Sequence, residues 1–300
     1  MKKQEYKNIP RALRLPFICV SLLPFIFGSL LAKNNFNLLR FILGFVAVAA
    51  THLSANLIND YADSKSGADW QDRRFYGFFG GSKLIQEGIL PERFYRNLAL
   101  SLASASAFSV IFLAVLLKSI LIIVLFLLII LLAWSYSVKP LQLSYRKMGE
   151  FIIFLLFGPA LVMGGYFIQT KVFPEARSFL LSLPFGFLTT AILYVNEIPD
   201  FPQDQTAKKF TWVGSSGLKT ASLTYIILIF FAFVFIALCI ARGFLGMISL
   251  ISFLFVFLAI KSVKILRKHF SDKEKLIQSS KLTIILHTLV SIVLIIDLLI

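Results

Sequence analysis

Long apolar runs separated by short polar segments make up this chain from end to end. Nine runs are near or above the length that crosses a hydrocarbon layer of about 30 Å, which takes about 20 apolar residues in a helix. They lie near residues 15–32, 38–58, 96–117, 119–136, 150–170, 178–197, 218–240, 243–261 and 282–300. Because a backbone inside lipid must satisfy its own hydrogen bonds, each run predicts a helix. The pattern therefore predicts an all-α, polytopic membrane protein with nine transmembrane helices.

The first apolar run follows a basic segment that resembles the start of a signal peptide. The run is long and no small-residue cleavage site follows it, so we expect a retained helix. The longest polar connections, residues 59–95 and 197–217, are too short for a separate soluble domain. Residues 1–300 are therefore predicted to form a single transmembrane domain in a cell membrane, with the lipid bilayer as partner.

Positive charge is distributed unevenly between the predicted loops. Of the 30 Lys and Arg residues, all but six lie on the side of the N-terminus. The six exceptions are Lys33, Arg40, Lys118, Lys171, Arg177 and Arg242. The positive-inside rule then predicts an N-in, C-out topology. The same rule accounts for the net charge of +15, so no nucleic-acid partner is expected.

Composition supports the membrane prediction and excludes several kinds of site. Hydrophobic residues make up 58% of the chain and charged residues 15%, against roughly 25% charged in soluble domains. Cys19 and Cys239 both lie in apolar runs, and His52, His269 and His287 are scattered without metal-ligand spacing. We expect no disulfide, zinc or thiol chemistry. Nothing in the sequence indicates an oligomeric state.

Eight of the 15 acidic residues lie at three predicted cytoplasmic helix ends. They are Asp60, Asp63, Asp69, Asp72, Glu150, Glu197, Asp200 and Asp204. Taken singly, each acid can be a solvated charge that balances a nearby Lys or Arg. Crowded carboxylates repel one another, however, and call for a compensating cation.

The spacing of these acids favours a shared site over a solvated rim. The second run ends with Asn59 and Asp63, and the sixth ends with Asn196, Asp200 and Asp204. Steps of four residues place these side chains on one helical face. The two helices run in the same direction through the membrane, so both motifs are predicted to face one cytoplasmic cavity. The prolines at 199 and 202 are expected to break the sixth helix there.

Two opposed clusters of oxygen ligands, without His or Cys, suit a hard cation such as Mg²⁺. Magnesium takes one or two carboxylates and completes its shell with water and substrate phosphates. The sequence therefore predicts a phosphorylated ligand bridged to the protein by Mg²⁺. The candidate phosphate-binding cations on the same side are Lys139, Arg146, Lys208 and Lys209.

These two motifs resemble the aspartate-rich motifs of the UbiA superfamily of intramembrane prenyltransferases. The segment Asn59-Asp60-Tyr61-Ala62-Asp63 is similar to its first motif, and Asn196 through Asp204 is similar to its second. The resemblance covers essentially the whole chain and implies a UbiA-type helical bundle of nine helices.

Further segments resemble the menaquinone-pathway branch, the 1,4-dihydroxy-2-naphthoate polyprenyltransferases. These segments are the run from Asn59 to Asp69, Gly80-Gly81-Ser82 with Gln86-Glu87-Gly88, and the loop from Tyr136 to Glu150. The chain departs from that branch at Asn196-Glu197-Ile198-Pro199-Asp200, where Asn-Asn-x-Arg-Asp is common. It departs again at Lys208-Lys209, where Gly-Lys is usual.

The resemblance implies prenyl transfer from an allylic polyprenyl diphosphate to an aromatic acceptor, on the cytoplasmic side. Lys139, Arg146 and Lys209 would bind the departing oxygens, and Tyr136 would stabilise the allylic cation. The residues implied to hold Mg²⁺ on the diphosphate are Asp60, Asp63, Asp200 and Asp204, assisted by Asn59, Asn196 and Asp69.

Two alternatives stay open at the level of sequence. One is another UbiA-type transferase with a different acceptor, such as 4-hydroxybenzoate. The other is a secondary transporter that uses intramembrane carboxylates as ion or proton sites. Transporters favour charges near the membrane midplane and discontinuous helices in both halves, whereas mid-helix charges are nearly absent here.

Overall fold

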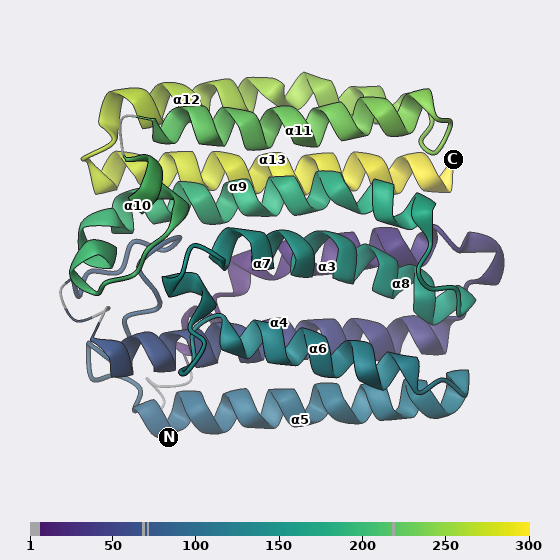
Figure 1. Ribbon diagram of the computed structural model, residues 1–300, viewed down its shortest axis with the longest axis horizontal. Helices are drawn as coiled ribbons and strands as arrows, with labels where there is room; N and C mark the ends of the chain where they lie inside the picture. The colour runs from purple at the N-terminus through teal and green to yellow at the C-terminus, as the bar shows by residue number, and fades with distance from the viewer. Residues whose placement is uncertain (1–6, 68–69, 71, 218–219) are drawn as a thin grey trace.

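The computed structural model describes every residue except 1–6, 68–69, 71 and 218–219. Long helices lie side by side along the long axis of the molecule (Figure 1). The α-helices are α2 Ile9–Ala12, α3 Ile18–Leu30, α4 Leu38–Ser66, α5 Glu92–Leu117, α6 Leu121–Ser135, α7 Gly149–Leu155, α8 Leu161–Thr170, α9 Ala176–Thr206, α10 Trp212–Ser216, α11 Ala221–Ala241, α12 Val256–His269 and α13 Lys273–Leu299. The all-α prediction is confirmed for the described residues.

Seven helical segments in the described residues are long and apolar enough to cross a membrane. They are Leu38–Ser66, Glu92–Leu117, Gly149–Thr170, Ala176–Thr206, Ala221–Ala241, Met247–His269 and Lys273–Leu299. The two other predicted spans correspond to shorter apolar helices, Leu15–Leu30 and Leu121–Ser135. Sixteen helical residues span only about 24 Å. The count of nine spans and the N-in, C-out topology therefore stay predictions.

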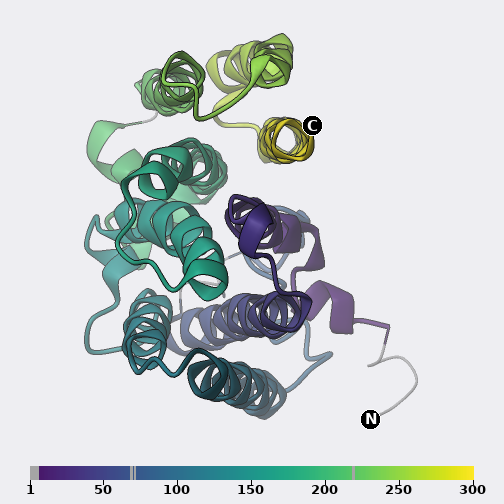
Figure 2. The same cartoon turned by 90° about the vertical axis from the view of Figure 1, so that its right-hand side faces the viewer.

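The helices form three groups when they are viewed end-on (Figure 2). Helices α11, α12 and α13 lie on one side and α4, α5 and α6 on the other, with α3 and α7–α9 between them. In the central helix α9, 78% of its apolar 18-residue stretch is buried. In α5, only 28% of the corresponding stretch is buried. The outer helices expose large side chains such as Phe108, which is 72% exposed. This distribution fits a bundle whose outer apolar surfaces face lipid.

Small residues allow the helices to approach closely. A Cβ added to Gly28 of α3 would lie 2.1 Å from the Val162 carbonyl oxygen of α8. A Cβ added to Gly165 of α8 would lie 2.6 Å from the Phe25 carbonyl oxygen of α3. Between α4 and α5, Ser54 Oγ donates a hydrogen bond of 2.8 Å to the Ala99 carbonyl oxygen. Close backbone approach and hydrogen bonds from small side chains are typical of helix packing in membranes.

Prolines affect the helices less than the sequence suggested. A π-helical turn with Pro159 inside it, Leu156–Ala160, joins α7 to α8. The expected break at Pro199 and Pro202 is wrong, because α9 continues to Thr206 with both prolines inside it. Each proline removes one backbone donor, yet the helix runs through both positions, and Pro199 is buried within it.

Candidate active site

The acid-bearing ends of α4 and α9 line one cavity of about 570 Å³. They lie at the same end of the bundle, where α10 and the longest connections also lie (Figure 1). The sequence-predicted site residues that line the cavity are Asn59, Asp63, Tyr136, Asn196, Asp200, Asp204 and Lys209. Two segments more than 130 residues apart in the chain therefore meet at one cavity, as the spacing of the acids predicted.

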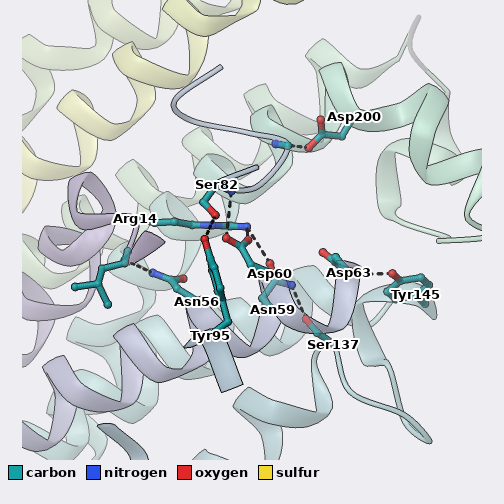
Figure 3. A network of polar contacts seen from close by, with 12 residues as sticks. Arg14, Asn56, Asn59, Asp60, Asp63, Ser82, Tyr95, Ser137, Tyr145 and Asp200 are labelled. Atoms are coloured by element: carbon teal, nitrogen blue, oxygen red, sulfur yellow. Dashed lines mark hydrogen bonds and ion pairs between the residues drawn. The ribbon is translucent and has the colours of Figure 1, made fainter. Parts of the chain in front are cut away.

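The motif on α4 is held by hydrogen bonds with the loop that follows α6. The Tyr145 hydroxyl donates to an Asp63 carboxylate oxygen at 3.0 Å (Figure 3). The Asn59 amide nitrogen donates to Ser137 Oγ. Burial raises the pKa of Tyr145, so its phenol stays protonated and donates to Asp63. Asn59 and Asp63 keep a fixed orientation at the cavity wall.

Asp60 faces a different neighbour. Its carboxylate pairs with the Arg14 guanidinium and accepts a hydrogen bond of 3.2 Å from the Ser82 backbone amide. Arg14 also donates to Asn59 Oδ1 at 3.3 Å. The Asp60 side chain is 3% exposed and does not line the cavity, whereas Arg14 does. Asp60 thus anchors a cation and the Ser82 loop beside the motif.

The motif on α9 combines anchored carboxylate oxygens with unpaired ones. Asp200 Oδ2 accepts a hydrogen bond of 3.0 Å from the backbone amide of Gly80 (Figure 3). Asp204 Oδ1 lies 3.4 Å from Lys209 Nζ. Among the described residues, no donor reaches four buried side-chain oxygens here: Asn196 Oδ1, Glu197 Oε2, Gln203 Oε1 and Asp204 Oδ2. These oxygens are available to a ligand or a metal.

Lys209 places a positive charge near carboxylates of both motifs, Asp204 and Asp63. Burial alone lowers the pKa of Lys209, but the carboxylates of Asp204 and Asp63 raise it well above its ordinary value. The ammonium group therefore stays charged at neutral pH. A backbone pairing fixes its segment, because the Phe210 amide donates to the Tyr145 carbonyl and the Lys147 amide donates to the Phe210 carbonyl. This pairing joins the loops that follow α6 and α9.

Residues 72–83 form a loop whose side chains line the cavity mouth, and the loop is fastened to α13. Lys273 Nζ donates to Asp72 Oδ2 at 2.7 Å, and the Tyr76 hydroxyl donates to the same oxygen at 3.2 Å. Gly80 adopts φ +73°, in the left-handed region that glycine enters without strain. Lys83 and Lys273 both line the cavity.

Residues 21–285 match the UbiA prenyltransferase family. The chain belongs to this family. It is 26% identical to the UbiA prenyltransferase domain-containing protein 1 of Dictyostelium discoideum, over 65% of this chain and 59% of the relative. It is also 26% identical to 1,4-dihydroxy-2-naphthoate octaprenyltransferase of Escherichia coli, over 68% of this chain and 65% of that relative. These matches span less than two thirds of either relative's length.

Solved UbiA homologues share the fold over nearly the whole chain. The apo structure of a homologue from Aeropyrum pernix K1 has a TM-score of 0.74 at 18% identity, covering 93% of this chain and 97% of that one. A homologue from Archaeoglobus fulgidus bound to DMAPP and Mg²⁺ has a TM-score of 0.66 at 17% identity, covering 95% and 98%. The prediction of a UbiA-type bundle is thereby confirmed.

Not every predicted cation of this UbiA chain reaches the cavity. Lys139 and Arg146 are exposed and lie outside its lining, and Arg146 donates to the Pro140 carbonyl oxygen at 2.9 Å. Asp69 lies outside the described residues. Lys208 is exposed with φ +54°, a conformation that suits the glycine usual at this position in the related branch. Of the predicted cations, only Lys209 lines the cavity.

The cavity also has basic residues that the sequence motifs did not indicate. Arg14, Lys83 and Lys273 line it. Lys83 follows Gly80-Gly81-Ser82 directly, so that glycine-rich segment was the available signal for it. Arg14 directly precedes the first apolar run and Lys273 lies in the charged segment before the last one, where basic residues are ordinarily interpreted as topology signals.

The donor set fits Mg²⁺ shared with a phosphate. No group of three Asp, Glu, His or Cys side chains forms a ready-made metal site in the described part of the chain. A cage made by the protein alone is not what Mg²⁺ requires, since it commonly takes one or two carboxylates together with water and phosphate oxygens. The unpaired oxygens of Asp204, Asn196 and Gln203 are hard ligands of this kind.

Proposed function

We propose that this chain transfers a prenyl group from an allylic prenyl diphosphate to an aromatic acceptor, with Mg²⁺, at the cytoplasmic face of a cell membrane. One observation carries the proposal: two Asn/Asp motifs and Lys209 meet at the mouth of a cavity that continues into an apolar interior. A diphosphate with a hydrocarbon tail has this same division into a charged end and an apolar end.

The mouth of the cavity binds the diphosphate. Asp63, Asp200 and Asp204 would hold Mg²⁺, with the amide oxygen of Asn196 completing the set, and the bound ion would neutralise charge on the leaving group. Lys209 and Lys83 would donate to the phosphate oxygens. Asp60 would act indirectly, because its carboxylate holds Arg14 and the Ser82 amide.

The apolar interior receives the prenyl chain. The lining continues past Tyr136 to Leu132, Ile129 and Phe126 of α6, and to Phe173 beyond α8. In the reaction, the C1–O bond of the donor breaks and its electron pair leaves with the diphosphate. The ring's π electrons then form the new C–C bond, and the attacked ring carbon loses a proton, or CO₂ where it carries a carboxylate. Apolar walls exclude water, and the ring of Tyr136 stabilises the developing allylic cation.

We infer that the acceptor is 1,4-dihydroxy-2-naphthoate, as in menaquinone biosynthesis. Relatives with this acceptor in their names include those of Escherichia coli and Haemophilus influenzae. The match to the second of these is 27% identical and covers 88% of this chain and 81% of the relative. The segments Asn59–Asp69 and Gly80–Ser82 resemble the same branch.

The test is transfer of a radiolabelled prenyl diphosphate to 1,4-dihydroxy-2-naphthoate and 4-hydroxybenzoate by the full chain in lipid nanodiscs. We expect Mg²⁺-dependent product with the naphthoate and a loss of at least a hundredfold in the double variant Asp63→Asn/Asp200→Asn. Asp272→Asn is the matched control, because asparagine also caps a helix well and Asp272 caps α13 away from the cavity lining. Full activity of the double variant would refute the metal site.

A further inference from the structure

Two polar side chains in the apolar part of the cavity have no hydrogen-bond partner among the residues that the structure describes. His52 of α4 is 8% exposed, and neither of its ring nitrogens has a partner among the described residues. Thr189 of α9 is 4% exposed, and its hydroxyl is likewise unpartnered within the described chain. Both side chains line the cavity. Burial of polar groups without partners is unfavourable, so their presence at a cavity wall indicates a ligand that supplies the missing hydrogen bonds.

His52 and Thr189 lie at the same sequence intervals before the acidic motifs of their own helices. His52 precedes Asn59 by seven residues and Asp63 by eleven, and Thr189 precedes Asn196 and Asp200 by the same two intervals. Seven and eleven residues are close to two and three helical turns, so each polar residue shares the cavity face of its motif. Eleven residues rise about 16 Å along a helix. His52 and Thr189 thus form a second polar level, deeper in the cavity than the acids.

An aromatic side chain connects the two walls at this level. The Phe157 ring meets the His52 imidazole edge-on, with centroids 5.5 Å apart and an interplanar angle of 84°. Phe157 also packs against a cluster that includes Ile192, three residues after Thr189 on α9. It belongs to the π-helical turn Leu156–Ala160, which Pro159 interrupts. The Phe157 ring thus contacts His52 of α4 and packs against an apolar cluster that includes a residue of α9 close in sequence to Thr189.

We propose that His52 and Thr189 bind the ring hydroxyl groups of a hydroxylated aromatic acceptor, whose ring packs against Phe157. This inference rests on the proposed function. His52 accepts a hydrogen bond from one hydroxyl and thereby increases electron density on the ring, and Thr189 binds the polar group at the other edge. The ring then lies between this deeper polar level and the diphosphate at the mouth, in line with the donor carbon that it attacks.

A binding experiment tests the site without any turnover. Affinities for 1,4-dihydroxy-2-naphthoate, kept under argon, and for 2-naphthoate, which lacks both hydroxyls, are measured with the full chain in nanodiscs. We expect wild type to prefer the dihydroxy compound, and His52→Phe to reduce that preference about tenfold while the affinity for 2-naphthoate holds. Thr189→Val is also expected to reduce the preference for the dihydroxy compound.

The matched control is His287→Phe. His287 is also buried, and its ring nitrogens have no partner among the described residues, but it lies on α13 outside the cavity lining. The His287→Phe variant should leave the preference for the dihydroxy compound over 2-naphthoate unchanged. Thermal unfolding of each variant identifies misfolded protein, and His52→Gln replaces His52→Phe if the latter does not fold. An undiminished preference in folded His52 and Thr189 variants would overturn the proposal.

Steady-state kinetics separates this inference from the proposed function. If wild type transfers the prenyl group, the His52 variant should raise the KM for the acceptor about tenfold and leave the KM for the prenyl diphosphate unchanged. Equal increases in both constants would overturn the acceptor site. If wild type produces no prenylated product from any donor, the proposed function fails, whereas the binding preference still reports on His52 and Thr189.

Discussion

The backbone amide of Gly80 donates a hydrogen bond of 3.0 Å to the carboxylate of Asp200, a residue 120 positions later in the chain. This contact joins the glycine-rich segment of the loop after α4 to the acidic end of α9. It leaves the other Asp200 oxygen for a metal or ligand and fixes the direction in which the carboxylate points. The geometry of the mouth therefore depends on the loop conformation as well as on the two acidic helices.

Gly80→Ala is expected to weaken prenyl diphosphate binding several-fold. At φ +73° an alanine is strained by roughly 1–2 kcal/mol, and its Cβ would lie 3.6 Å from Asp200 Oδ1 and 3.5 Å from Lys83 Cε. The comparison is Gly77→Ala, which has a similar φ of +89° but no atom within 4 Å of the added Cβ. Isothermal titration with the diphosphate should separate the two variants. Equal losses would mean that strain alone, without the Asp200 contact, is responsible.

Lys209→Met is expected to lower kcat by about a hundredfold or more, the usual cost of removing a donor that stabilises developing negative charge. It would also leave the Asp204 carboxylate buried without its cation. Lys208→Gly should retain activity, because Lys208 is exposed and its φ of +54° is accessible to glycine. Single-turnover rates at saturating substrate measure the effect. Similar losses in both variants would argue against a specific role for Lys209.

The Asp72–Lys273 ion pair predicts a pH-dependent contribution to stability. Burial alone raises the pKa of Asp72, but the hydrogen bonds from Lys273 and from the Arg74 amide outweigh it and lower the pKa below its ordinary value. A lowered pKa stabilises the fold above the unfolded value of about 3.9, and this stabilisation is lost as pH falls through the folded pKa.

Asp72→Asn should therefore lower the free energy of unfolding by about 0.5–1 kcal/mol at pH 7, since the pair is partly exposed. The difference from wild type should shrink as pH falls below about 4. Thermal unfolding in detergent between pH 7 and pH 3 checks both statements. Lys273→Gln should reproduce the loss, and a double variant with fully additive losses would show that the two side chains do not interact.

Gly164→Phe is expected to shorten the prenyl donor that the enzyme accepts. Gly164 of α8 lines the cavity, and a Cβ added there would meet nothing within 4 Å. A side chain at this position can therefore begin in open space and extend toward the apolar interior. Competition between geranyl and longer all-trans diphosphates should shift toward geranyl in the variant, with the diphosphate affinity of the short donor unchanged. An unaltered preference would place the prenyl chain elsewhere.

The N-in topology predicts opposite labelling of two exposed loop positions. In a background with Cys19→Ser and Cys239→Ala, Lys118→Cys should react with an impermeant maleimide on intact cells. Lys147→Cys should react only after permeabilisation. Both native lysines are exposed. The reverse pattern would place the proposed active site on the outer face.

The chain's local patterns were sufficient for the helical architecture and for the two acidic motifs. Run length sets whether a helix can cross a bilayer, and a four-residue step places side chains on one face. Both are properties of a short segment, and they predicted that Asp63, Asp200 and Asp204 would share a cavity. The same local rule did not predict that Asp60 lies outside the cavity lining, because Asp60 is three residues before Asp63, a spacing that also places side chains near one another. Its position goes with its contact with Arg14, a residue 46 positions earlier in the chain.

Only the tertiary structure decided which cations and which histidine belong to the cavity. Lys139 and Arg146 looked equivalent to Lys209 in sequence, yet the pairing of the Tyr145 and Phe210 segments leaves them outside. Lys273 lies at the mouth through a contact with Asp72 that spans 201 residues. His52 has no neighbour in sequence that suggests a ligand. Its environment comes from Phe157 and from α9 across the cavity, because contacts between distant segments depend on how helices pack and leave no periodic signal in either segment.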